Sequence, residues 1–167
     1  NMSVAAGAQL TTKDNKGWIT KISADLKTVD HNWLGANNKL STPAGIRISG
    51  GTLFVADIDQ LVAFSVATPT AAPTRSTAVT KAGTAPAILL NDVVVDGTAA
   101  LVTDTLGGRI IKFATPTVAN NTGAVFGTMT SYKFPNGLFV DGTNLILAET
   151  EDFSMPNLQG KIYKMPV

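Results

Sequence analysis

The segment Pro135-Asn136-Gly137-Leu138-Phe139-Val140-Asp141 decides the fold, because two earlier segments repeat it. These are Pro43-Ala44-Gly45-Ile46-Arg47-Ile48-Ser49 and Leu90-Asn91-Asp92-Val93-Val94-Val95-Asp96. A second apolar run follows each segment and ends on an acid, which lies 12 positions after the third residue of the segment: 45 to 57, 92 to 104 and 137 to 149. The segments start 47 and 45 residues apart (43 to 90, 90 to 135), which indicates an array of equivalent structural units.

Each unit consists of short alternating or β-branched runs, separated by turns rich in Gly, Asn, Asp or Thr. A third run lies at residues 61–64, 109–113 and 161–165, and a weaker fourth run lies near residues 77–81 and 124–129. No window keeps apolar residues at i, i+3, i+4 and i+7, so almost no helix is expected. About four strands in a unit of roughly 46 residues is typical of a β-propeller blade.

The two ends of the chain belong to the same repeat, because residues 2–5 and 17–22 match residues 145–148 and 160–165 with a constant offset of 143. The predicted fold is all-β, with propeller blades of four antiparallel strands and about 3.5 blades present. The expected units are a partial blade at 1–41, blades at 42–88 and 89–133, and a partial blade at 134–167.

An arc of this size is not expected to close by itself, because known propellers have about four to eight blades. It is therefore either part of a larger propeller or a half propeller that copies complete by association, since open sheet edges invite pairing. The opening Asn1-Met2-Ser3 favours a segment of a longer gene product.

Composition excludes several classes of function. The 167 residues, of 17.4 kDa, carry 13 Lys and Arg against 12 Asp and Glu, so nothing indicates a nucleic-acid partner or an anionic membrane surface. The lack of Cys excludes thiol chemistry and disulfides, and the single His31 excludes multi-histidine zinc sites. No apolar run reaches the roughly 18 residues of a membrane helix. Low charge and many Thr, Ala and Asn residues favour an extracellular or periplasmic protein, although the chain contains no signal peptide.

The repeats resemble those of known propellers. Residues 43–46 with 53–57 resemble the NHL-type blade pattern, whereas Leu90-Asn91-Asp92-Val93 and Pro135-Asn136-Gly137-Leu138 resemble signatures of the gluconolactonase and senescence-marker-protein family, which paraoxonases share in altered form. The resemblance covers about residues 2–165. It implies a six-bladed propeller with a divalent cation, commonly calcium, at the top of its central channel. It also implies a calcium-dependent lactonase or esterase, whose substrate is a small ester or lactone.

Carried over to this chain, the resemblance implies that Asn91 and Asn136 contact the metal directly or through water. Amide oxygens suit a hard cation, and the innermost strands of successive blades converge on one axis. Asp92 either lines a substrate site or caps its strand. The first repeat has Ala44 in the slot of the two Asn residues, which cannot bind a metal. The family's acidic ligands, one of them the proposed general base, align outside residues 1–167, so the catalytic base is not assigned and two neutral amides hold a cation weakly.

The remaining polar residues have structural interpretations. Asp57, Asp104 and Glu149 recur in every unit, which favours a role in bonding the neighbouring turn. Asp96 and Asp141 each precede a Gly and are expected in turns.

The alternative function is a non-enzymatic NHL-type propeller that serves as a binding or assembly scaffold. Its copies would associate through edge strands at residues 2–6 and 161–165. His31 is expected on an outer strand, far from the axis, and Trp18 and Trp33 are expected to pack between blades.

Overall fold

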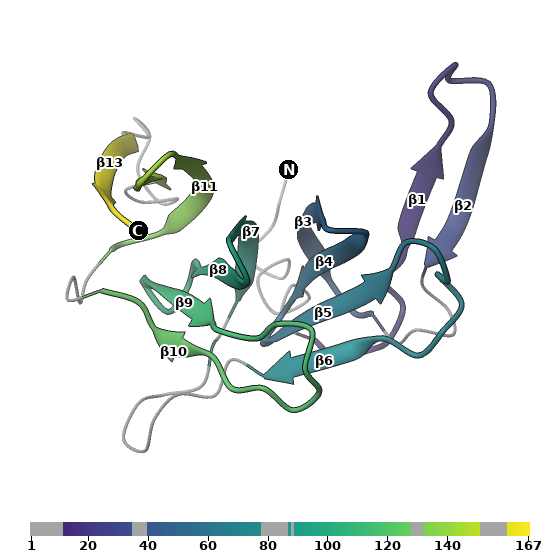
Figure 1. Ribbon diagram of the computed structural model, residues 1–167, viewed down its shortest axis with the longest axis horizontal. Coiled ribbons are helices and arrows are strands. Elements are labelled where there is room, and N and C mark those ends of the chain that lie inside the picture. Colours follow the sequence, from purple (N-terminus) through teal and green to yellow (C-terminus); the bar gives the residue numbers. More distant parts are fainter. Residues whose placement is uncertain (1–11, 35–39, 78–86, 88, 128–131, 151–159) are drawn as a thin grey trace.

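The computed structural model describes residues 12–34, 40–77, 87, 89–127, 132–150 and 160–167. All regular structure in these residues is β-strand, arranged in four antiparallel sheets that form an open crescent (Figure 1). Sheet 1 pairs β1 (Ile19–Ile22) with β2 (Val29–Leu34). Sheet 2 contains β3 (Pro43–Ser49), β4 (Thr52–Asp57), β5 (Gln60–Ser65) and β6 (Thr74–Thr77). Sheet 3 contains β7 (Leu90–Asp96), β8 (Ala99–Asp104), β9 (Arg109–Phe113) and β10 (Ala124–Val125). Sheet 4 contains β11 (Pro135–Asp141), β12 (Asn144–Thr150) and β13 (Gly160–Pro166).

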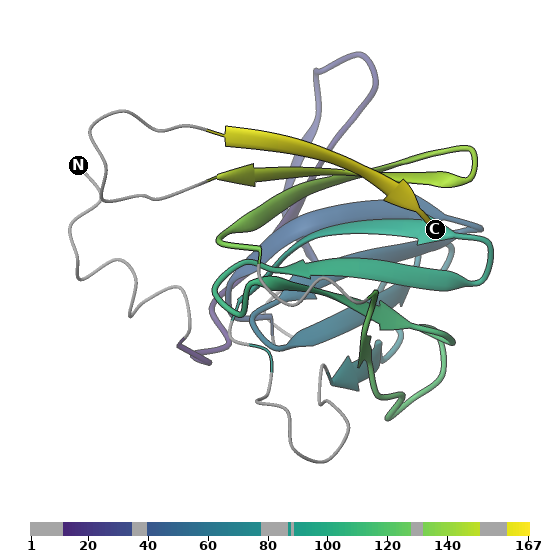
Figure 2. The same cartoon turned by 90° about the vertical axis from the view of Figure 1, so that its left-hand side faces the viewer.

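The prediction of an all-β chain built from four-stranded antiparallel propeller blades is confirmed. In sheets 2 and 3 each strand pairs with the next along the chain, and the innermost strands β3 and β7 lie toward the concave side of the crescent (Figure 1). Seen from the side, sheets 3 and 4 form successive stacked layers (Figure 2). The fourth strand of sheet 2, expected near 77–81, covers residues 74–77, and residues 78–81 lie outside the described residues. The expected strand at residues 2–6 also lies outside them.

Apolar clusters fill the space between successive sheets. Leu53 and Val55 face sheet 1, whereas the alternate residues Phe54 and Ala56 face sheet 3. Both faces of β4 are therefore buried, which explains why its sequence is continuously apolar and does not alternate with polar residues. Full burial of a Leu or Phe side chain is worth about 1.5–3 kcal/mol, so these junctions are the main stabilising contacts of the crescent.

A buried acid occupies the equivalent position in sheets 2, 3 and 4, as the repeat predicts. Each lies at the end of the second strand, is at most 5% exposed, and accepts a backbone N–H from the residues that lead into the innermost strand. Asp57 accepts from Ser41 and Thr42, Asp104 from Leu89, and Glu149 from Lys133. Asp104 also forms an ion pair with Arg109 at 2.9 Å. These contacts confirm the structural role that was expected of the three acids.

Candidate functional site

Asn91, Asp92 and Asn136 lie in β-bulges, a feature that the sequence patterns did not predict. In sheet 3 the pair Leu90–Asp104 is followed by Val93–Val102, so residues 91 and 92 together oppose Thr103. Strands β3 and β11 have the same shift, at residues 44–45 and 136–137. The signal for these bulges was Gly45 and Gly137 inside strand patterns, because glycine within a strand often marks a bulge. The inserted residue re-aims the chain at the start of each innermost strand.

The structure brings two of these bulges together through Thr103. The Thr103 hydroxyl accepts a hydrogen bond from the backbone N–H of Asp92 at 2.9 Å and donates one to the carbonyl oxygen of Asn136 at 2.8 Å. Asn91 and Asn136 therefore occupy the same position on neighbouring innermost strands, and the two strands are joined directly at that level. That their side chains converge on one centre stays a prediction.

Both carboxylate oxygens of Asp92 bind backbone donors. Oδ1 accepts the N–H of Val93 at 2.8 Å, and Oδ2 accepts the N–H of Leu138 in sheet 4 at 2.7 Å. The side chain therefore caps its own strand and also ties sheet 3 to sheet 4. The capping interpretation is what the geometry shows, while a contact of Asp92 with substrate stays a prediction.

Thr103 and Thr105 are site residues that sequence reasoning missed. The Thr105 hydroxyl donates to the carbonyl oxygen of Pro135 at 2.6 Å, and both threonines are at most 3% exposed. The only signal was a departure from the repeat, because Ala56 and Ile58 hold the equivalent positions in sheet 2. Threonine is common in strands, so this departure alone did not single them out.

At the junction between sheets 2 and 3, hydrogen bonds to backbone carbonyl oxygens join the two sheets. The N–H of Leu90 donates to the carbonyl oxygen of Ile58 at 2.6 Å, and Arg47 Nε donates to the carbonyl oxygen of Val93 at 3.4 Å. Gly45 lies so close to sheet 3 that an added Cβ would be 2.7 Å from Asp92 Cα. The position that holds Asp92 in sheet 3 must therefore be a glycine in sheet 2.

A polar cleft lies farther from the innermost strands, where sheet 2 meets the segment before sheet 1. Lys13 forms an ion pair with Asp59 there at 2.7 Å, and Arg75 Nη1 donates to Gln60 Oε1 at 3.1 Å. Burial raises the pKa of Asp57, although the N–H donors of Ser41 and Thr42 partly oppose the rise. Burial also lowers the pKa of Arg75. The charged groups of this cleft are thus engaged with one another or with the backbone.

The sequence predicts the amides of Asn91 and Asn136 as cation ligands, and Asp92 lies directly after Asn91 in the chain. Among the described residues there is no group of three or more His, Cys, Asp or Glu side chains that could hold a metal ion. His31 lies on the exposed outer strand β2 of sheet 1, as expected, and not on an innermost strand. Within the described residues, no cluster of acidic side chains therefore accompanies Asn91 and Asn136.

The membrane-spanning potential of the chain and its similarity to known proteins remain to be described. No helix in the described part of the chain combines the length and apolar character needed to cross a membrane. A comparison of the chain with protein-family models and with curated proteins finds no match. Inference about function therefore depends on the geometry of the innermost strands.

Proposed function

We propose that the start of the innermost strands binds a divalent cation, with calcium favoured, in a propeller of the lactonase or esterase type. The supporting observation is that Asn91 and Asn136 hold the same bulge position on neighbouring innermost strands, joined through Thr103. Amide oxygens are hard ligands of the kind that calcium takes. The chain would supply part of the site, and the substrate would be a small ester or lactone.

The residues present fit one side of a coordination shell. Calcium takes about 6–8 oxygen ligands, and two amides with one nearby carboxylate cover fewer than these. When bound, the ion would polarise the carbonyl of an ester or lactone. The chain's own contribution is positional: Thr103 and Asp92 fix the two bulges relative to each other, which sets the spacing of the amides. The base that activates water belongs to the part of the site outside this donor set.

A calorimetric titration of the chelator-treated protein with calcium tests the proposal. Wild type is expected to give a saturable heat, which Asn136→Ala removes or strongly reduces. Asn144→Ala is the matched control, because Asn144 lies at the opposite end of the same sheet and is expected to behave as wild type. Equal heats for wild type and Asn136→Ala would show that Asn136 is not a ligand. Calcium-dependent hydrolysis of a simple lactone tests the catalytic half of the proposal separately.

A second candidate is a non-enzymatic binding or assembly scaffold. It is favoured by the commitment of the four acids Asp57, Asp92, Asp104 and Glu149 to backbone donors within and between sheets. Under this alternative calcium produces no saturable heat, and Asn136→Ala changes neither stability nor association. The same titration therefore separates the two candidates.

A further inference from the structure

In each sheet, the forward face is the face that looks toward the next sheet along the chain, and the backward face is the opposite one. At each junction of the crescent, the forward face of one sheet packs against the backward face of the next. The forward face of sheet 2 carries Phe54, Ala56 and Leu61, which are buried against sheet 3. The forward face of sheet 3 carries Val94, Leu101 and Ile110, which are 3%, 0% and 1% exposed because sheet 4 covers them. These faces are apolar because another sheet packs on each of them.

Sheet 4 has the same forward face, and within the described part of the chain no sheet packs on it. Its strand pairing places Phe139 beside Ile146, and Ile162 beside Ala148, at the positions that match Val94, Leu101 and Ile110. Phe139 is 59% exposed and Ile162 is 78% exposed. Large exposed apolar side chains gathered on one sheet face mark an interaction surface. The repeat identifies what fits this surface, namely the backward face of another sheet of the same kind.

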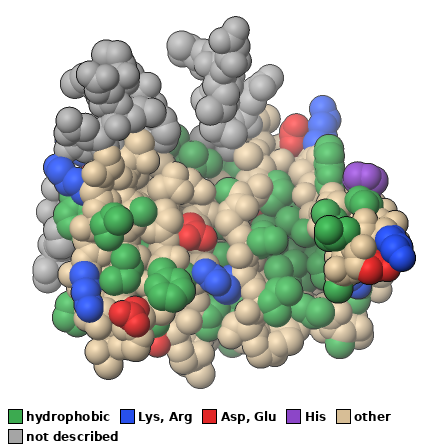
Figure 3. Space-filling model, turned by 90° about the horizontal axis from the view of Figure 1, so that it is seen from above, with side chains coloured by type: hydrophobic (Ala, Val, Ile, Leu, Met, Phe, Trp, Pro, Cys, Tyr) green, Lys and Arg blue, Asp and Glu red, His purple; other side chains and the backbone are tan. Residues whose placement is uncertain are grey.

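At the opposite end of the crescent, none of the described sheets covers the backward face of sheet 1. In sheet 1, Ile19 and Trp33 pack on sheet 2, whereas the alternate face holds the pair Ile22 and Val29, and Trp18 directly precedes β1. These three side chains are 56%, 46% and 54% exposed. The expected packing between blades is thus seen for Trp33, whereas Trp18 belongs to none of the apolar clusters of the described residues. Viewed into the opening of the crescent, hydrophobic side chains are visible over both ends (Figure 3).

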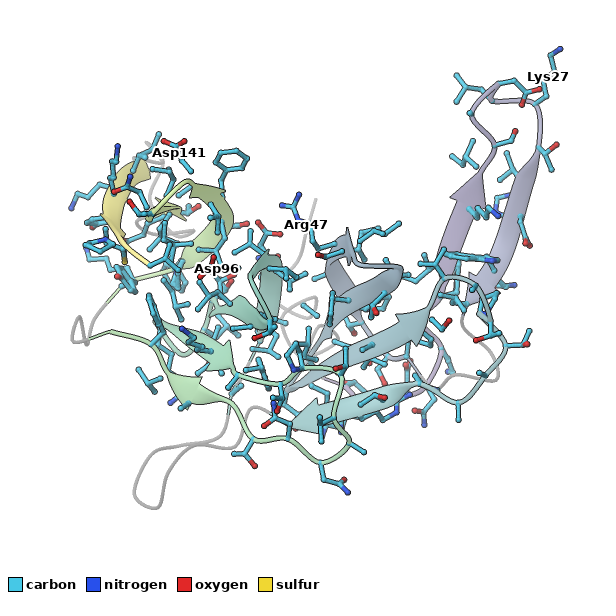
Figure 4. The ribbon with its side chains drawn as sticks, viewed as in Figure 1. Lys27, Arg47, Asp96 and Asp141 are labelled. Carbon is cyan, nitrogen blue, oxygen red and sulfur yellow. The ribbon has the colours of Figure 1, made fainter. Side chains whose placement is uncertain are left out.

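We propose that the forward face of sheet 4 binds the backward face of sheet 1 in a second copy of this chain. The two ends lie on the same side of the crescent, with Arg47 extending into the opening between them (Figures 1 and 4). One further copy, related by a two-fold axis through this opening, then makes two identical head-to-tail contacts and closes the ring. Four sheets from each copy give about eight blade positions, which lies within the range of known propellers.

A second copy is the occupant because the chain itself presents both halves of the junction that joins its own sheets. Burying the side chains of Phe139, Ile162, Trp18 and Ile22 supplies the hydrophobic driving force. The contact is made by sheet faces, in contrast to the edge pairing that the sequence suggests. It does not depend on a cation at the innermost strands.

Size-exclusion chromatography with multi-angle light scattering, performed on the 167-residue chain, tests the proposal. Wild type is expected at twice the chain mass of 17.4 kDa. Ile162→Asp in the forward face and Ile22→Asp in the backward face are each expected to give monomers. Val118→Asp is the matched control, because Val118 is 54% exposed but lies in the segment between β9 and β10, and it is expected to stay dimeric. Phe139→Asp repeats the forward-face test, and circular dichroism checks that each variant keeps its β-structure.

Mixing the two monomeric variants distinguishes head-to-tail contact from other arrangements. An equimolar mixture of Ile162→Asp and Ile22→Asp retains one intact pair of faces and is expected to form a heterodimer. A monomeric wild type, an Ile22→Asp variant that still dimerises, a mixture that stays monomeric, or open filaments would each overturn the closed two-copy ring.

Discussion

The carboxylate of Asp92 accepts a hydrogen bond from the backbone N–H of Leu138 at 2.7 Å, across 46 residues of sequence. Its other oxygen binds the N–H of Val93, so one side chain satisfies donors in the bulges of two neighbouring sheets. The contact connects two equivalent points of the repeat. It gives the candidate site its rigidity, because Asn91 and Asn136 each lie within two residues of it.

Replacing Asp92 with Asn is expected to lower the free energy of unfolding by about 1–3 kcal/mol, because the amide offers one oxygen where two N–H groups need acceptors. Urea denaturation measures the change. Asp96→Asn, at the far end of the same strand (Figure 4), is the control and is expected to change stability by no more than about 0.5 kcal/mol. Similar losses for the two variants would contradict a bridging role for Asp92.

Two glycines at equivalent positions should respond differently to alanine. A Cβ on Gly45 would be 2.7 Å from Asp92 Cα, so Gly45→Ala is expected to cost about 1–3 kcal/mol through overpacking. A Cβ on Gly137 would meet only Ala148 Cβ, at 3.6 Å, so Gly137→Ala is expected to be neutral or to stabilise by up to about 1 kcal/mol. Thermal or urea unfolding of both variants checks the difference. A Gly45→Ala variant as stable as Gly137→Ala would mean that the sheets do not approach so closely.

Asp104 should be the most sensitive of the three repeated acids. Its side chain is fully buried, pairs with Arg109, and accepts the N–H groups of Leu89 and Gly107. Asp104→Ala is expected to cost about 3–5 kcal/mol, because it removes the ion-pair partner of the part-buried Arg109 and the acceptor of two backbone N–H groups. Arg109→Met should cost less, because the carboxylate keeps both N–H donors. Chemical denaturation gives the order, and a greater loss in Arg109→Met would contradict this account.

Asp57 should make stability depend on pH in the acidic range. Because burial raises its pKa in the folded chain above 3.8, the folded state binds more protons than the unfolded state just above that value. The contribution of Asp57 to the free energy of unfolding therefore falls as pH rises from 3.8 through the raised pKa, and is constant above it. The loss caused by Asp57→Asn, measured by urea denaturation at several pH values, is expected to shrink over this window. A loss that grows with pH would reverse the sign and contradict a raised pKa.

Much of the architecture could be predicted, because it depends on patterns of residues that are close in the sequence. The recurrence of Asp57, Asp104 and Glu149 at one phase indicated their shared bond to the preceding turn, and the structure shows that bond in each sheet. The bulges and the hydroxyl bridges could not be predicted. The partners of Thr103 lie 11 and 33 residues away, and the second of them, Asn136, reaches Thr103 only when two sheets pack.

The sequence by itself determined the strands, their meander order and the equivalence of the repeats, because strand alternation and turn residues act over a few neighbouring positions. Only the tertiary structure decided which apolar faces are covered. Ile110 and Ile162 are equivalent in the repeat, yet they are 1% and 78% exposed, because sheet 4 packs on Ile110 whereas no described sheet packs on Ile162. Burial depends on what packs against a face, and no local pattern contains that information.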